Sequence, residues 1–283
     1  AAAIALGTTA NAGPTDYNDS DGNDQSESGV FDLLHFAHKL QRWNGAHDFV
    51  QSILVLHGRK VVSGGDNACI KLHELGSTSQ LRRFDGHTGA VMCLASTASG
   101  RELISGSVDH SVRIWDVETG ACSCYIRGHT RSVHCLKVGK AQPHGASMLF
   151  TGSRDHTIKL WDMRTSHCQN TLRGHTGSVT CVDAQGWKLV SGGGYNRGAD
   201  DDEVLSVDST IRCWDLRRLG SSQESACLWK RQAPSPTTQQ GDPVLSLQLT
   251  EDKVLTSHGG TRWTARIWDF NGVQLDRPPH ALP

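Results

Sequence analysis

Short runs of alternating apolar and polar residues recur along this chain, separated by turns rich in glycine, serine, threonine and aspartate. Typical runs are residues 91–94 (Val-Met-Cys-Leu), 112–115 (Val-Arg-Ile-Trp) and 158–161 (Ile-Lys-Leu-Trp). Because side chains alternate between the two faces of a strand, such runs predict β-strands. No stretch of useful length has the 3.6-residue apolar spacing of an amphipathic helix. The pattern therefore predicts an all-β protein.

Three segments of the chain resemble one another, each opening with Gly-His-Thr and closing with Trp-Asp. They are residues 86–116, 128–162 and 174–215. The histidines of these segments, His87, His129 and His175, are 42 and 46 residues apart. A period of this size indicates repeats that each form one small sheet and bury it by stacking on the neighbouring repeat.

Weaker copies flank the three clear repeats. Before them, residues 46–47, 63–66 and 72–74 follow the pattern, with His73-Glu74 in place of Trp-Asp. After them, residues 243–269 follow it without Gly-His and without the aspartate of the turn. A very degenerate copy is visible at residues 30–43, and residues 1–6 resemble the start of a truncated strand.

The Gly-His and Trp-Asp signature resembles that of the WD-repeat β-propeller family, and its style is most similar to the F-box/WD propellers of ubiquitin-ligase substrate receptors. The resemblance implies four-stranded sheets, or blades, stacked around a central channel. We expect a propeller over residues 28–283, with five clear blades plus a degenerate or truncated one. Residues 1–27 are acidic, and we expect a disordered segment or a truncated degenerate blade there.

Each clear repeat contains one histidine, one serine or threonine, one aspartate and one tryptophan. These tetrads are His87, Ser105, Asp109 and Trp115; His129, Thr151, Asp155 and Trp161; and His175, Ser191, Asp208 and Trp214. Serine, histidine and aspartate also compose a hydrolase triad, but a catalytic site is needed once and not three times. The family resemblance implies a buried hydrogen-bond chain from aspartate through histidine and hydroxyl to the indole. We therefore expect structural tetrads and no enzyme.

Composition excludes several other classes of function. The chain has 28 basic and 29 acidic residues, so no overall field favours nucleic acid or an anionic membrane. No apolar run approaches the ~20 residues needed to span a bilayer. Nine widely spaced cysteines, an odd number, favour a reducing compartment, the cytoplasm and/or the nucleus. Only Cys122 and Cys124 are closely spaced and no phosphate-cradling glycine loop exists, so we expect no metal and no cofactor.

A partner-binding face is predicted from residues beside the tetrads. Arg154 directly precedes Asp155, where F-box/WD receptors of phosphorylated segments carry arginine, and His134 stands where such receptors often carry another. We expect both residues to cluster with Arg131 near the mouth of the channel. The insertion of residues 194–207 adds an acidic flap, which either binds a partner of mixed charge or covers the basic spot. The flap contains Asp200, Asp201, Asp202 and Glu203. An ordinary disordered surface loop is the alternative.

Two Trp-Asp-x-Arg boxes are similar to those with which substrate receptors dock on the cullin-4 adaptor. Their residues are Trp161, Asp162, Arg164, Trp214, Asp215 and Arg217. The sequence thus predicts a non-enzymatic propeller that binds a protein or peptide partner. In one version of this hypothesis the partner is phosphorylated. The specific prediction is the substrate-recognition part of a cullin-type ubiquitin ligase receptor. The alternative is a general WD-repeat scaffold for complex assembly with no ligase link.

Overall fold

The computed structural model describes residues 49–56, 59–74, 80–141, 146–197, 204–219, 226–232, 241–259, 263–269 and 280–281. It contains five antiparallel four-stranded sheets, so the predicted all-β fold is confirmed and the five clear blades correspond to these sheets. The acidic segment of residues 1–27 and the degenerate copy at residues 30–43 lie outside the described residues.

The strands follow one another in chain order within each sheet. The first sheet holds β1 (Val50–Leu56), β2 (Lys60–Gly65), β3 (Ile70–Glu74) and β4 (Gln80–Phe84). The second holds β5 (Val91–Ser96), β6 (Glu102–Ser107), β7 (Ser111–Asp116) and β8 (Cys122–Arg127). The third holds β9 (Val133–Ala141), β10 (Ala146–Ser153), β11 (Thr157–Asp162) and β12 (Cys168–Arg173). The fourth holds β13 (Val179–Gln185), β14 (Lys188–Gly193), β17 (Thr210–Asp215) and β18 (Cys227–Gln232). The fifth holds β19 (Val244–Leu249), β20 (Lys253–His258), β21 (Thr264–Asp269) and β22 (His280–Ala281).

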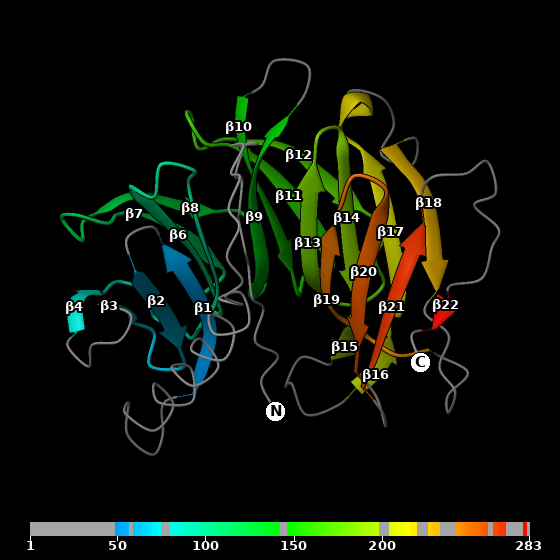
Figure 1. The fold of residues 1–283 in the computed structure, drawn as a ribbon, viewed down its shortest axis with the longest axis horizontal. Coiled ribbons are helices and arrows are strands. Elements are labelled where there is room, and N and C mark those ends of the chain that lie inside the picture. The colour runs from blue at the N-terminus through cyan, green and yellow to red at the C-terminus, as the bar shows by residue number, and fades with distance from the viewer. Residues whose placement is uncertain are drawn as a thin grey trace, which may run out of the picture.

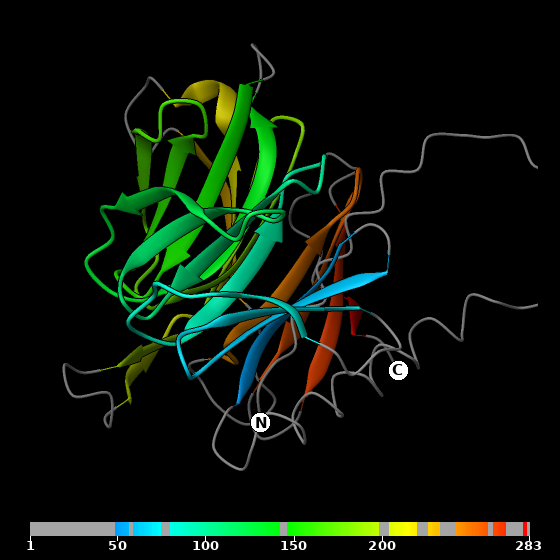
Figure 2. The same ribbon diagram turned by 90° about the vertical axis from the view of Figure 1, so that its left-hand side faces the viewer.

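The five sheets form an arc, with the first strand of each sheet on the inside (Figure 1). The inner strands β1, β5, β9, β13 and β19 pack side by side in chain order. The first and fifth sheets are the two ends of this arc, and the second, third and fourth sheets follow one another between them (Figure 2). Two shorter elements lie outside the repeat, the hairpin of β15 (Tyr195–Arg197) and β16 (Val204–Val207) and the 3-10 turn η1 (Leu216–Arg218).

The hydrophobic core lies between neighbouring sheets. In each of the first four sheets, one position in the second strand faces the following sheet and its residue is fully buried. These residues are Val62, Ile104, Phe150 and Val190. Leu255 occupies the same position in the fifth sheet and is 39% exposed. Each sheet thus needs a following neighbour to remove its apolar face from water, which contributes roughly 25 cal/mol per Å².

A glycine two residues after that position explains why the sheets can approach so closely. Cβ atoms added at Gly64, Gly106, Gly152 and Gly192 would lie 2.6–2.7 Å from a methyl group of the valine that opens the next inner strand. Only a residue without a side chain fits there. In the fifth sheet the same position holds Ser257.

Asp183 on β13 connects three sheets through its carboxylate. Its Oδ1 lies 2.8 Å from Nζ of Lys137 on β9, and its Oδ2 accepts a 2.8 Å hydrogen bond from the backbone N–H of Leu249 on β19. Asp183 lies within β13, which continues to Gln185, and the turn that follows consists of Gly186, at φ 59°, and Trp187.

Candidate functional site

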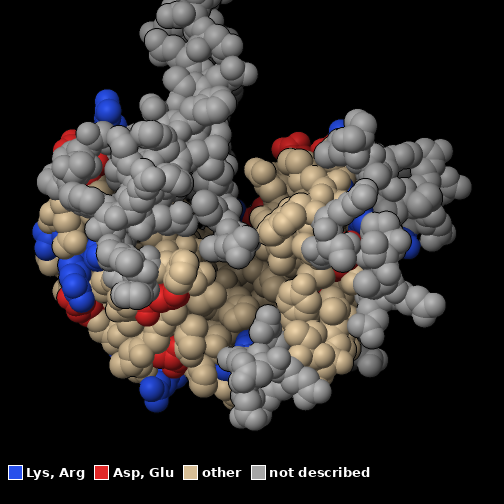
Figure 3. Space-filling view, turned by 90° about the horizontal axis from the view of Figure 1, so that it is seen from below, with Lys and Arg blue, Asp and Glu red and all other residues tan. Residues whose placement is uncertain are grey.

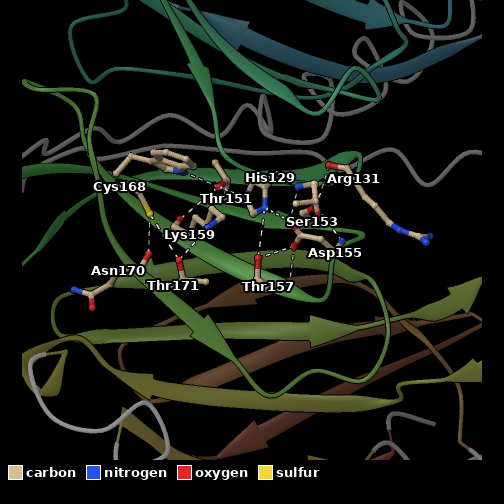
Figure 4. Close-up of polar contacts among 12 residues, drawn as sticks. His129, Arg131, Thr151, Ser153, Asp155, Thr157, Lys159, Cys168, Asn170 and Thr171 are labelled. Atoms are coloured by element: carbon tan, nitrogen blue, oxygen red, sulfur yellow. Dashed lines mark hydrogen bonds and ion pairs between the residues drawn. The ribbon is translucent and has the colours of Figure 1, made fainter.

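The tetrad of the third sheet is a continuous hydrogen-bond chain (Figure 4). The indole N–H of Trp161 donates to Oγ1 of Thr151 over 2.8 Å. Oγ1 of Thr151 lies 2.8 Å from Nε2 of His129, and Nδ1 of His129 lies 2.8 Å from Oδ2 of Asp155. Because a carboxylate only accepts hydrogen bonds, Nδ1 of His129 donates to Asp155, and the Thr151 hydroxyl joins this imidazole to the indole.

The other two clear repeats contain the same chain. The corresponding distances are 2.7–2.9 Å in the tetrads of His87, Ser105, Asp109 and Trp115 and of His175, Ser191, Asp208 and Trp214. Burial alone would raise the pKa of Asp155, but hydrogen bonds from His129, Thr157 and the Thr130 N–H outweigh it and hold the pKa well below its usual range. The hydroxyls of Ser105, Thr151 and Ser191 are on fully buried residues. A substrate cannot reach them as nucleophiles.

The fifth sheet contains a substitute for the tetrad that the sequence analysis missed. The indole N–H of Trp268 donates to Oγ1 of Thr256 over 2.7 Å, as in the clear repeats. The imidazole that meets this hydroxyl, also at 2.7 Å, belongs to His258 on the same strand and not to a Gly-His loop. The sequence signal was Thr-x-His upstream of Ile-Trp-Asp, at residues 256–258.

The tetrad histidines and aspartates lie at the same end of the strands in each sheet. The face of the molecule formed there is called the His–Asp face. Arg131, His134 and Arg154 lie on it, all half-buried. The N–H of Arg154 donates to the carbonyl of Ser132 over 2.9 Å, so the loops that carry Arg131 and Arg154 are adjacent. Burial, and then the charge of Arg154, lower the pKa of His134 to about 4. His134 is therefore neutral at pH 7, and Arg131 extends away from the tetrad (Figure 4).

The insertion in the fourth repeat leaves the His–Asp face as the β15–β16 hairpin, at the lower end of the molecule in Figure 1. Its base is fixed, because the carbonyl of Tyr195 accepts from both the N–H (3.1 Å) and the hydroxyl (2.7 Å) of Ser178. The carbonyl of Gly194 accepts from the N–H of the tetrad residue Asp208 over 2.8 Å. The acidic residues Asp200, Asp201, Asp202 and Glu203 lie outside the described residues.

Charged side chains of both signs are intermingled over the described surface at this end of the molecule (Figure 3). The surface toward the middle of the arc is mostly uncharged. Any charge recognition on this face therefore depends on local groups such as Arg131 and Arg154.

The two Trp-Asp-x-Arg boxes lie at the opposite end of the sheets and differ from each other. Both indoles, of Trp161 and Trp214, are buried in their tetrads, which leaves the arginines to reach solvent. The guanidinium of Arg217 donates two 2.9 Å hydrogen bonds to the carboxylate of Asp215. It also stacks on Trp187, with its Cζ 4.1 Å from the centre of the ring.

In the third sheet, only the backbone N–H of Arg164 bonds to Asp162, over 2.8 Å, and the Arg164 residue is exposed. The two boxes therefore do not present equivalent arginines.

In the described part of the chain, no group of three or more histidine, cysteine or acidic side chains is placed to hold a metal ion. Among the same residues, no helix is both long and apolar enough to cross a bilayer. All nine cysteines are described and all are free thiols.

Comparison with known families identifies the repeats. The family model "WD domain, G-beta repeat" matches residues 78–116, 120–162 and 166–215. These stretches of the chain are thus WD40 repeats, and the sheets they form have the fold of a WD-repeat β-propeller. Each matched stretch covers the outer strand of one sheet and three strands of the next. One repeat therefore connects two neighbouring sheets covalently.

Three relatives each match less than a third of this chain. "Cell division control protein 4" of Saccharomyces cerevisiae is 36% identical over 78 residues, which is 28% of this chain and 10% of that protein. "F-box/WD repeat-containing protein 10" of Mus musculus is 37% identical over 89 residues, 31% of this chain and 9% of that protein. "Mitochondrial division protein 1" of Aspergillus clavatus is 37% identical over 68 residues, 24% of this chain and 10% of that protein. The matches thus span about a tenth of the length of these relatives.

One solved structure supports the fold over most of the chain. A chain of the "Crystal Structure of Mitotic Checkpoint Complex" superposes with a TM-score of 0.63 and 22% identity. The match covers 80% of this chain and 63% of that one. At this identity the likeness establishes the propeller fold.

Proposed function

We propose that this chain is a non-enzymatic receptor for an anionic, phosphorylated protein segment, and the substrate-recognition part of a cullin-type ubiquitin ligase. The observation that carries the proposal is the pair of neighbouring loops with Arg131 and Arg154 on the His–Asp face of the third sheet. Arginine gives phosphate planar, bidentate hydrogen bonds that lysine and histidine do not reproduce. Similarity to an F-box/WD repeat-containing protein supports the ligase part of the proposal.

His134 has a different part in this proposal from that of the two arginines. Its pKa of about 4 makes it a neutral hydrogen-bonding group at pH 7 beside Arg154, so the positive charge of the site comes from the arginines alone. The acidic residues Asp200 to Glu203 are proposed to compete with the phosphorylated segment for these arginines. A ligand must then carry more negative charge than the flap to displace it.

The adaptor is proposed to dock on the opposite end of the sheets through Arg164. Arg217 already satisfies Asp215 and stacks on Trp187, so an adaptor would have to break these contacts to use it. Arg164 is exposed and its guanidinium is available to a carboxylate of the partner. The free state of all nine cysteines supports the proposal that the protein works in the cytoplasm and/or nucleus.

A scaffold for complex assembly without a ligase link is the second candidate. It is favoured by the variety of the relatives, which include a mitochondrial division protein as well as an F-box/WD protein. A solved neighbour from a multi-protein checkpoint complex fits the same interpretation.

Binding to a phosphopeptide array tests the receptor. Arg154→Ala should weaken binding of selected phosphopeptides about 10–100-fold, because a charge-assisted hydrogen bond contributes about 1.5–3 kcal/mol. Val108 occupies the equivalent position in the second sheet, so Val108→Ala is the matched control. Deleting residues 195–206 should strengthen binding. If Arg154→Ala and the deletion both leave binding unchanged, this face is not the site.

Binding to purified cullin-ligase adaptors distinguishes the ligase receptor from the scaffold. The receptor should bind an adaptor, and Arg164→Ala should reduce this more than Arg217→Ala. A chain that binds phosphopeptides but no adaptor would be a scaffold.

A further inference from the structure

A tyrosine on the outer strand of the second sheet lies between two guanidinium groups. Arg113 on β7 faces Tyr125 on β8 in the strand register, and its Cζ lies 4.4 Å from the centre of the phenol ring. Cζ of Arg127 lies 5.3 Å from the same ring, and its Nε–H donates to the Tyr125 hydroxyl over 2.5 Å. These three residues are called the Arg–Tyr–Arg cluster.

The cluster carries positive charge that the described structure does not neutralise. Within the described residues, Arg113 bonds only to the thiol of Cys122 among polar side chains, at 3.6 Å, and Arg127 only to Tyr125. Neither guanidinium forms an ion pair with a carboxylate there. Two cations around one phenol form a site in which a dianion on the phenol oxygen would be favourable.

The phenol is also accessible. Tyr125 is 45% exposed. It lies on β8, the edge strand of its sheet, so no fifth strand of the sheet covers it. The next sheet carries Thr171 at the equivalent position, opposite Lys159, and ends its outer strand with Arg173. The acceptor hydroxyl between two arginines is therefore a property of the second sheet and not of the repeat.

We propose that Tyr125 is a phosphorylation site, and that Arg113 and Arg127 hold the phosphate once it is attached. The donor is a nucleoside triphosphate bound to a tyrosine kinase. The bond between Tyr125 Oη and the γ-phosphorus forms, the bond from that phosphorus to the bridging oxygen breaks, and the nucleoside diphosphate leaves. The phenolic proton passes to the kinase's catalytic carboxylate. The Arg127 guanidinium, which is exposed, then moves from the phenol oxygen to the phosphate oxygens.

Phosphorylation of the folded full chain by a purified tyrosine kinase of broad specificity tests the proposal. A free peptide of residues 119–131 serves as the substrate control, and the modified residue is identified by mass spectrometry. Tyr125 should be labelled, in preference to Tyr195, which is half-buried at the base of the hairpin. Labelling of the peptide but not of Tyr125 in the folded chain would overturn the proposal.

The second pKa of the attached phosphate measures whether the two arginines hold it. In the ³¹P spectrum, the second pKa of the phosphate should fall below its usual value of about 6 and return toward it in Arg127→Gln and Arg113→Gln. Arg173→Gln, at the equivalent position of the third sheet, should leave it unchanged. Phosphorylation should also raise the melting temperature of the wild type by about 2–4 °C and not that of Arg127→Gln. An ordinary phosphate pKa that is the same in all four proteins would show that the arginines do not hold the phosphate.

Discussion

Nε2 of His258 lies 2.7 Å from Oγ1 of Thr256, two residues earlier on the same strand of the fifth sheet. This contact takes the place of the histidine-to-hydroxyl bond that a Gly-His loop makes in the three clear repeats. The hydroxyl of Thr256 still accepts the indole N–H of Trp268. The hydroxyl-to-indole bond is therefore retained in a sheet whose loop histidine is absent, and the imidazole comes from the strand itself.

The pH dependence of stability should reveal this buried imidazole. Burial, and then the charge of Arg266, lower the pKa of His258 to about 4 from its ordinary 6.5. Between pH 4 and pH 6.5, this histidine binds a proton in the unfolded chain but not in the folded chain. Stability is thus fully present above pH 6.5 and is lost as the pH falls toward 4. At pH 4.5 the loss from this one group should be on the order of 2 kcal/mol.

Thermal melting across pH 7.5 to 4.5 measures the effect. His258→Gln removes the titrating group and should flatten the dependence of the melting temperature on pH. His167 is exposed, so His167→Gln serves as the control and should keep the slope of the wild type. Equal slopes in both variants would contradict the assignment to His258.

The tetrads should matter for stability. Asp155→Ala leaves the His129 N–H and the Thr130 N–H without their acceptor, and Trp161→Phe removes the indole donor to Thr151. Each change should lower the free energy of unfolding by about 1–3 kcal/mol, measured by urea denaturation. Asp162→Ala, at a surface turn of the same repeat, should cost less. A variant of full stability that had lost a hydrolytic activity would reverse this interpretation.

The contacts of Asp183 should stabilise the packing of the third, fourth and fifth sheets. Asp183→Ala leaves Lys137 and the Leu249 N–H unpaired and should lower the free energy of unfolding by about 1–3 kcal/mol. Lys137→Met in the same background should cost less than it does alone, because the two side chains act as one pair. A double-mutant cycle in urea measures this coupling, and strictly additive costs would show that the ion pair contributes nothing.

The cysteines should fall into two classes of reactivity. Cys122 and Cys168 are exposed, whereas Cys135 and Cys181 are buried on neighbouring inner strands. Burial raises the pKa of the Cys181 thiol to about 12, so almost no thiolate is present near pH 8. Brief treatment of the native protein with iodoacetamide, followed by peptide mapping, should label Cys122 and Cys168 first. Early labelling of Cys181 would indicate that the sheets open locally.

Much of the fold was predictable because the residues that define each repeat lie close together in the sequence. Gly-His, the serine or threonine, the turn aspartate and Trp-Asp occur in the same order in every clear repeat, with the insertion of residues 194–207 as the main departure in spacing. Each has the side chain that the hydrogen-bond chain requires. Alternating runs such as residues 112–115 give the strands without reference to any distant residue. The need for glycine at position 106 also follows, once Val133 of the next inner strand is known to approach it.

The sequence by itself determined the all-β class, the strands of the clear repeats and the members of their tetrads, because these depend on local spacing and on the chemistry of single residues. Tertiary structure decided the rest. That Asp183 joins three sheets, that His258 replaces a loop histidine and that Arg217 is held by Asp215 depend on how side chains pack in space. Two residues of the same type in the same motif, Arg164 and Arg217, differ because only one has Trp187 beside it. Local pattern cannot encode such contacts, since they arise from neighbours that the fold alone brings together.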